Sequence, residues 1–155
     1  GVGLVGSEMC IRDSYNCGYC QKFHQELINV MNDNSLKLVI IQMPILGNFS
    51  EELTKLALAS SLQGQFKVVH NYLYSTERKS KMEDILADLF LRGVDLEILK
   101  SDLDSQEVSD FLSIHKSYAD EFKFTGTPAT IIGNQIIPGF IDADKITEIL
   151  EKEFS

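Results

Sequence analysis

The sequence of 155 residues has no tryptophan and is poor in proline and cysteine, with three of each. It also lacks an excess of positive charge, because 14 Lys and Arg residues face 23 Asp and Glu residues, for a net charge of −9. Proteins that bind nucleic acids carry basic patches that neutralise phosphates, so nucleic acid is excluded as a partner. No apolar run approaches the roughly 20 residues of a membrane-spanning helix, so we expect no membrane span.

The length and the 44% hydrophobic content favour one globular unit with a single core. The N-terminus has no basic start followed by a continuous apolar stretch, so it does not resemble a secretory signal. We expect an acidic domain of mixed helices and strands.

The first fourteen residues resemble a laboratory sequence. Reverse translation of Glu8–Ser14 reproduces, almost base for base, the mosaic-end adapter that transposase-based libraries attach to DNA. We therefore predict that residues 1–14 are a translated scar on an N-terminally truncated metagenomic sequence, and that residues 15–155 form the domain. The alternative is a genuine glycine-spaced strand at Val2–Val5. Excluding the segment removes Cys10 and leaves an even count of two cysteines.

Apolar periodicity orders the remaining chain. The segment Cys17–Asn32 has helical spacing, and Leu36–Met43 is short, apolar and β-branched, which is typical of a buried strand. From about residue 50 to 122 the pattern is helical throughout and predicts an all-helical insert. Within it we expect N-caps at Ser50 and at Asp104, which has Glu107 three residues on.

The second half of the chain contains further signals of helix ends and turns. Gly93 is expected to close a helix in the left-handed conformation, and another helix should cover Asp95–Lys100. The short runs on either side of Gly133-Asn134 predict an antiparallel hairpin. Asp142 is expected to cap a final helix.

The spacing of Cys17 and Cys20 points to redox chemistry. Two cysteines three residues apart at the start of a helix lie on neighbouring positions of one turn and can form a small disulfide ring. Backbone N–H groups and the helix dipole stabilise a thiolate on the first cysteine, and the thiolate is the species that attacks disulfides. We predict Cys17 as the nucleophile and Cys20 as the resolving cysteine, with Gly18 and Tyr19 tuning the pair.

Two other interpretations of this region stay open. Cys-x-x-Cys is also half of a zinc site, but the three histidines do not supply a spaced second half, so we favour no metal. His24 follows Cys20 by one turn and is predicted to be a partly exposed helix residue, with an electrostatic effect on the thiolate as the alternative. His115 falls on an apolar stripe and is expected to be a satisfied core residue.

Thr127-Pro128 places a proline directly before a predicted strand, where a missing N–H donor is tolerated only at an edge or a first position. Together, the motifs Tyr15–Cys20, Gly126–Ala129 and Ile137–Gly139 resemble the DsbA family of thiol-disulfide oxidoreductases, from about Tyr15 to the C-terminus.

The resemblance implies an α/β, thioredoxin-like fold with an inserted helical subdomain. It implies that Pro128 is a cis-proline packed against the redox pair and that the Thr127 backbone binds extended client segments. It further implies an enzyme without a cofactor that forms or isomerises disulfide bonds in extracytoplasmic, for example periplasmic, proteins. Its partners would be cysteine-containing clients and a membrane redox protein that recharges the pair.

Two departures from the family bear on function. The dipeptide Gly18-Tyr19 differs from the Pro-His of the strong oxidant in the family, so the direction of exchange is open. The family also carries an upstream strand and commonly a buried acid six residues before the first cysteine, where this chain has Ile11 in the suspect segment. The central strand could therefore be absent or foreign, and a peptide-binding module with a structural disulfide is the alternative function.

Overall fold

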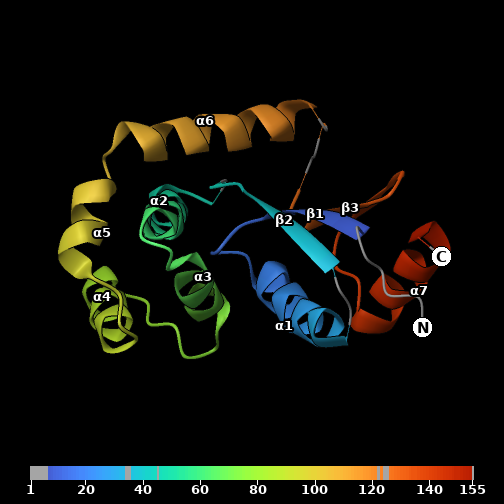
Figure 1. The fold of residues 1–155 in the computed structure, drawn as a ribbon, viewed down its shortest axis with the longest axis horizontal. Helices are drawn as coiled ribbons and strands as arrows, with labels where there is room; N and C mark the ends of the chain where they lie inside the picture. The colour runs from blue at the N-terminus through green and yellow to red at the C-terminus, as the bar shows by residue number, and fades with distance from the viewer. Residues whose placement is uncertain (1–6, 34–35, 45, 122, 124–125, 155) are drawn as a thin grey trace.

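The computed structural model describes residues 7–33, 36–44, 46–121, 123 and 126–154. At its centre is a mixed sheet with the strand order β2-β1-β3-β4 (Figure 1). The first two strands run parallel, and the remaining pairs are antiparallel. The strands are β1 (Ser7–Asp13), β2 (Leu36–Gln42), β3 (Ala129–Ile132) and β4 (Gln135–Pro138).

Strand β1 comes from the segment that we set aside as a translated adapter. Met9 and Ile11 are two residues apart in β1, so they point to the same face of the sheet, and both side chains are fully buried. The expectation that the central strand could be absent is therefore not met in this structure. The origin of residues 1–14 stays a prediction, since a strand position accepts any run with suitable alternation. The alternative strand at Val2–Val5 lies outside the described residues.

One face of the sheet is covered by helices α1 (Gly18–Asp33) and α7 (Ala143–Phe154) (Figure 1). Burial of each large apolar side chain contributes about 1.5–3 kcal/mol, so the cluster between these layers is a main source of stability. We call it the sheet core, and its buried members are Met9, Ile11, Phe23, Leu27, Val30, Ile132, Ile146, Ile149 and Leu150.

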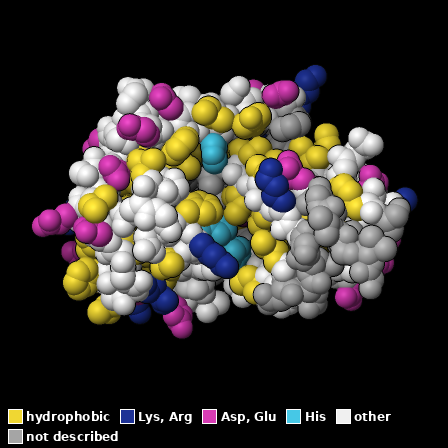
Figure 2. Space-filling view, viewed as in Figure 1, with side chains coloured by type: hydrophobic (Ala, Val, Ile, Leu, Met, Phe, Trp, Pro, Cys, Tyr) yellow, Lys and Arg dark blue, Asp and Glu magenta, His cyan; other side chains and the backbone are white. Residues whose placement is uncertain are grey.

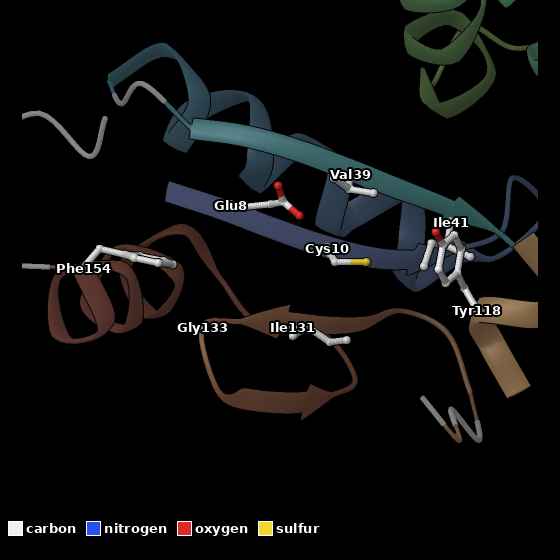
Figure 3. A pocket seen from close by; sticks show the side chains of 8 residues that line it. All are labelled: Glu8, Cys10, Val39, Ile41, Tyr118, Ile131, Gly133 and Phe154. Carbon is white, nitrogen blue, oxygen red and sulfur yellow. The ribbon is translucent and has the colours of Figure 1, made fainter. Parts of the chain in front are cut away.

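The opposite face of the sheet is hollowed by a groove of about 430 Å³. Cys10 projects into this groove from β1, and Tyr118 and Phe154 lie toward its two ends (Figure 3). Burial and the neighbouring Glu8 raise the pKa of the Cys10 thiol to about 11. Cys10 is therefore a neutral thiol and a poor nucleophile near pH 7.

The chain between β2 and β3 is helical, as its periodicity predicts. These helices pack beside the sheet and extend away from it (Figure 1). They enclose a second buried cluster, which we call the insert core and which includes Tyr15, Cys20 and Tyr74. The helices are α2 (Asn48–Leu62), α3 (Phe66–Tyr74), α4 (Met82–Leu91), α5 (Leu96–Asp102) and α6 (Gln106–Glu121).

Several predicted helix ends are confirmed. Gly93 follows α4 with a φ of 87°, a left-handed conformation that glycine adopts without strain. The helix predicted over Asp95–Lys100 is α5, which begins one residue later, because the Asp95 carboxylate caps it and accepts hydrogen bonds from the backbone N–H groups of Glu97 and Ile98. Asp142 accepts from the N–H of Lys145 at the start of α7.

Two predicted caps are wrong. Helix α2 begins at Asn48, two residues before Ser50, and the buried Ser50 hydroxyl instead shares a hydrogen bond of 3.0 Å with Ser14. At α6 the Val108 N–H donates to Ser105, one residue after the expected Asp104. At α2 the cap position is taken by Gly47, which makes no side-chain cap hydrogen bond, and at α6 the serine next to Asp104 supplies the cap.

The predicted hairpin is confirmed as β3 and β4, joined at Gly133-Asn134. Gly133 has a φ of 58°, which suits a tight turn between strands. The hairpin brings Pro128, directly before β3, and Gly139, directly after β4, to the same end of the sheet, where the Gly139 N–H donates to the Pro128 carbonyl at 2.9 Å.

Candidate active site

Cys17 lies at the N-terminus of α1, at the position that caps the helix. Its N–H donates to the Ser14 carbonyl at 3.1 Å, and its own carbonyl accepts the N–H of Gln21 at 3.1 Å. The Cys17 Sγ in turn accepts the backbone N–H of Cys20 at 3.3 Å. A helix start of this kind stabilises negative charge on the sulfur.

The two cysteines differ in exposure. Cys17 is part-exposed, whereas Cys20 is fully buried in the insert core, and both are free thiols. Burial, and secondly the charge of Asp13, raise the pKa of the Cys20 thiol strongly. Cys17 is therefore the sulfur that an incoming disulfide can reach, and Cys20 needs a proton acceptor before it can attack.

The dipeptide between the cysteines is open to solvent. Tyr19 is 64% exposed, and the ammonium of Lys22 lies 5.6 Å from the centre of its ring. A Cβ added at Gly18 would meet no atom of the described residues within 4 Å, so packing against them does not require glycine there. Both positions can therefore vary without disturbing the core.

The Thr127-Pro128 loop packs directly against Cys17. The peptide bond between Thr127 and Pro128 is cis, and Pro128 is buried. The Cys17 thiol donates to the Thr127 carbonyl, with 3.7 Å between sulfur and oxygen. Residues 110 positions apart thus form one surface around the exposed sulfur.

Asp13 is a site residue that the sequence argument missed. It ends β1 and is only 1% exposed, and the Cys20 thiol and the Tyr74 hydroxyl act to lower its pKa against the larger effect of burial. Burial raises its pKa to about 6, against an ordinary value of 3.8. An acid with this pKa beside a buried thiol can exchange a proton with it near neutral pH.

The missed signal was an acid at the end of a strand, four residues before the first cysteine. Asp13 lies in the segment that resembles an adapter, and the family resemblance predicts the acid at position 11. The structure places Ile11 in the sheet core, two residues earlier on the same face of β1. The acid beneath the redox pair is therefore shifted along the strand relative to the expected position.

Histidine and tyrosine rings form a buried layer behind Cys20. His24 is 5% exposed and stacks on Tyr74 with 4.9 Å between ring centres, and His70 lies edge-on to His24 at 4.9 Å. The prediction that His24 is partly exposed is therefore wrong. Burial lowers the pKa of His24, so its ring is uncharged near pH 7 and exerts no strong electrostatic effect on Cys17.

His115 is satisfied, as expected, but it lies half-buried at the edge of the sheet. Its Nδ1 accepts the backbone N–H of Gln42 at 2.9 Å, which ties α6 to the end of β2. Histidine side chains are visible in the middle of the face in Figure 2, where the insert meets the sheet. Within the described part of the chain, no group of three metal-ligating side chains is placed to hold a metal.

Among the described residues, no helix has the length and apolar content to span a bilayer. A mixed sheet, a helix that begins at a Cys-x-x-Cys pair and a cis-proline loop against the first sulfur define a thioredoxin-fold protein with a dithiol site. The chain belongs to the thioredoxin family, whose model matches residues 9–152.

Solved structures with the same fold agree with this assignment. A thioredoxin-like oxidoreductase from Silicibacter pomeroyi DSS-3 is 25% identical, with a TM-score of 0.88 over 95% of this chain and 86% of that one. The thiol-disulfide exchange protein alpha-DsbA2 from Wolbachia pipientis is 21% identical, with a TM-score of 0.86 over 95% and 81% of the two chains.

The catalytic domain of ScsC from Proteus mirabilis is 21% identical, with a TM-score of 0.81 over 96% and 84% of the two chains. No curated protein matches the sequence. The likeness confirms the DsbA-like resemblance and the α/β thioredoxin-like fold with inserted helices.

Proposed function

We propose that this protein catalyses thiol-disulfide exchange, forming or isomerising disulfide bonds in client proteins through Cys17 and Cys20. The observation that carries the proposal is the part-exposed Cys17 sulfur, which accepts the N–H of Cys20 at 3.3 Å at the start of α1 while the second thiol lies buried behind it. One reachable sulfur and one protected sulfur suit transfer of a disulfide to a client better than a static cross-link.

In the oxidising direction, a client thiolate attacks the Cys17 sulfur of the Cys17–Cys20 disulfide. The bond between the two sulfurs breaks, and Cys20 leaves with the electron pair and takes up a proton. A second client thiolate then attacks the client sulfur of the mixed disulfide and displaces Cys17 as a thiolate. The client gains one disulfide, and the protein leaves as the dithiol.

The Thr127-Pro128 loop supports a role in holding the client during this exchange. Its backbone faces the Cys17 sulfur, so an extended client segment that pairs with Thr127 would present its cysteine to Cys17. We also propose, from the family resemblance, an extracytoplasmic location such as the periplasm and a membrane redox partner that recharges the pair.

Cysteine variants test the proposal. Cys17→Ser should abolish oxidation of a dithiol peptide by the oxidised protein. Cys20→Ser, mixed with a disulfide-bonded peptide, should accumulate a Cys17–peptide mixed disulfide that mass spectrometry detects, because Cys17 attacks the peptide disulfide and no second thiol of the protein releases it. Cys10→Ser is the matched control and should retain activity, because Cys10 lies in the groove on the far face of the sheet. Retained oxidation in Cys17→Ser would refute the proposal.

A peptide-binding module with a structural disulfide is the second candidate, and the measured reactivity of Cys17 separates the two. A catalytic Cys17 should react with iodoacetamide well below about pH 8, whereas a structural bond should resist mild reduction and yield no such thiol. The direction of exchange follows from the reduction potential. A reduction potential of about −120 mV would indicate an oxidase, and a potential of about −270 mV would indicate a reductant.

A further inference from the structure

The loop of residues 75–81 joins α3 to α4 and is bonded to the start of α1, where Cys17 lies. Gln21 follows Cys17 by one helical turn, and its N–H donates to the Cys17 carbonyl at 3.1 Å. The Gln21 Nε2 donates to the Ser75 carbonyl at 3.0 Å, and the Arg78 N–H donates to the same carbonyl at 3.3 Å. One acceptor therefore ties Arg78 to the first turn of the redox helix.

The side chain of Arg78 is held on an aromatic ring. Its guanidinium lies over Phe49, 5.9 Å from the ring centre. Phe49, in the first turn of α2, and Cys17 are both part-buried residues that pack against the insert core. Arg78 therefore belongs to the side of the redox site that the insert supplies, whereas the Thr127-Pro128 loop contacts Cys17 from the hairpin side.

The charge of Arg78 is not neutralised within the fold. The guanidinium forms no ion pair with any residue that the structure describes, and its Nη1 is buried without a hydrogen-bond partner in that part of the chain. Burial lowers the pKa of Arg78, but an arginine stays charged near pH 7. A buried, unpaired cation is unfavourable, so its presence beside the redox site calls for a partner.

A shortage of acids does not explain the unpaired charge, because the chain has 23 Asp and Glu residues against 14 Lys and Arg residues. The acids nearest to Arg78 in the loop and on the adjoining helices are engaged elsewhere. The Glu77 carboxylate pairs with Arg92 at 3.0 Å, and the Asp88 carboxylate accepts the Tyr72 hydroxyl at 2.8 Å. The anion that Arg78 lacks must therefore come from another molecule.

We infer that Arg78 is a specificity-determining residue of the exchange reaction: its guanidinium binds a carboxylate of the client segment that lies against Cys17. The inference rests on the proposed function, because it names the class of client that Cys17 meets. It goes beyond that function in predicting that acidic client segments are preferred, although the protein itself has a net charge of −9.

The chemistry of the two groups supports this match. The planar N–H donors of a guanidinium fit the two oxygens of a carboxylate, and carboxylates are the anions that a polypeptide carries on its side chains and at its C-terminus. The Phe49 ring fixes the plane of the guanidinium before the client arrives. An extended client advances by about 3.3 Å per residue, so positions a few residues from its cysteine can reach the 75–81 loop.

The test compares matched peptides. Excess oxidised protein is mixed with dithiol peptides that are acetylated and amidated at their ends, and the second-order rate constant of peptide oxidation is measured. One Glu is placed in turn at each of three positions on either side of the first cysteine, and Gln replaces it in the matched peptide. Each rate is divided by that of the same peptide with a small uncharged disulfide, which removes the effect of Glu on the cysteine itself.

In at least one position the Glu peptide should react about tenfold faster than its Gln partner. Arg78→Met should bring this ratio to about one, and Arg78→Lys should give an intermediate ratio, because a lysine keeps the charge and loses the fork of donors. Lys81→Met is the matched control, since it removes one exposed cation from the same loop, and it should keep the wild-type ratio. The preference should persist at about 0.5 M salt, which screens long-range attraction.

Three results would overturn the inference: no preference for Glu at any position, an unchanged ratio in Arg78→Met, or an equal fall of the ratio in Lys81→Met. If Arg78→Met does not fold, an unchanged ratio in Arg78→Lys refutes it. A Gln peptide with a free C-terminal carboxylate shows whether the bound group is a side chain or a chain end, because only the matching peptide gains from Arg78.

Failure of the proposed function gives a different result, because the wild-type protein would then oxidise neither peptide of a pair. Binding is measured separately, with peptides that carry Ser in place of Cys and with the Cys17→Ser/Cys20→Ser double variant. The Arg78 Nε–H resonance, followed by nitrogen NMR, should shift on addition of the Glu peptide and not of the Gln peptide. Equal affinity for the two peptides, with no shift at Arg78, would overturn the inference regardless of activity.

Discussion

The sheet core and a buried polar cluster beside Cys20, made of Asp13, Tyr15, His24 and His70, lie on either side of α1 and have opposite chemical characters. The sheet core, which α1 joins through Phe23, Leu27 and Val30, consists entirely of apolar residues. On its other side, α1 presents Cys20 and His24 to α3, where buried Asp13 and His70 lie close by. One helix therefore connects a region that stabilises the fold to a region that tunes the thiol.

Burial on the polar side of α1 has a free-energy cost that burial on the apolar side does not have. Burying an acid and two histidines is unfavourable unless hydrogen bonds compensate. One Asp13 carboxyl oxygen and the His24 Nε2 have no hydrogen-bond partner among the described residues. The cost is concentrated next to Cys20, which is where a raised pKa is useful for proton exchange.

The largest expected effect comes from truncating a large apolar side chain in the sheet core. Phe23 is fully buried and contacts Phe140 edge-on, with 6.5 Å between ring centres. Phe23→Ala should lower the free energy of unfolding by about 3–5 kcal/mol, equally at acidic and neutral pH, because no titrating group is involved. Urea denaturation measures the loss. The exposed Tyr19→Ala is the control and should change stability by less than about 0.5 kcal/mol.

Asp13→Asn tests the polar side of α1, because it replaces a buried titrating acid by a neutral amide. The pKa of Asp13 is raised to about 6 in the fold, from an ordinary value of 3.8. Its stabilising contribution is therefore complete below about pH 4 and is lost as the pH rises through about 6. Relative to Asp13→Asn, the wild-type protein should lose about 3 kcal/mol of unfolding free energy over this window.

Denaturation curves of both proteins across this pH range measure the difference. Glu83→Gln, on the exposed face of α4, removes one negative charge without changing a buried group and serves as the control. A parallel pH dependence of wild type and Asp13→Asn would show that Asp13 is not the group that titrates.

The contrast between the clusters also explains what the sequence could predict. The apolar spacing of Phe23, Leu27 and Val30 reports a helix that packs on a sheet, and the insert, the hairpin and the Cys17–Cys20 pair follow from equally local patterns. Local patterns do not report partners that are distant along the chain. Ser50 bonds with Ser14, which lies 36 positions away, instead of capping α2.

The polar cluster escaped prediction for the same reason. His24 looked partly exposed because its partners belong to α3, about 50 residues later in the chain, and no periodicity on α1 identifies them. Asp13 belongs to the segment that resembles an adapter, and an acid at the end of a strand carries no local signal of burial. Burial of a charged group is a property of the assembled fold, so the pKa of such a group is not readable from its neighbours in sequence.

The smallest expected effect comes from Tyr15→Phe, which makes one member of the polar cluster apolar. Tyr15 is 2% exposed, and its hydroxyl lies 2.7 Å from the Nδ1 of His70. Burial lowers the pKa of His70 to about 3 and raises that of Tyr15 well above 10, so the hydrogen bond joins a neutral phenol and a neutral imidazole. Tyr15→Phe leaves that nitrogen buried without its partner and should cost about 1–2 kcal/mol of stability.

A double-mutant cycle with His70→Phe then tests whether the polarity itself causes the cost. When both partners are apolar, no buried acceptor is left unpaired, so Tyr15→Phe should cost much less in the His70→Phe background than in the wild type. The coupling is measured by urea denaturation at neutral pH. Equal losses in both backgrounds would mean that the hydroxyl stabilises the protein through packing alone, and that the two sides of α1 differ in composition but not in how they are held together.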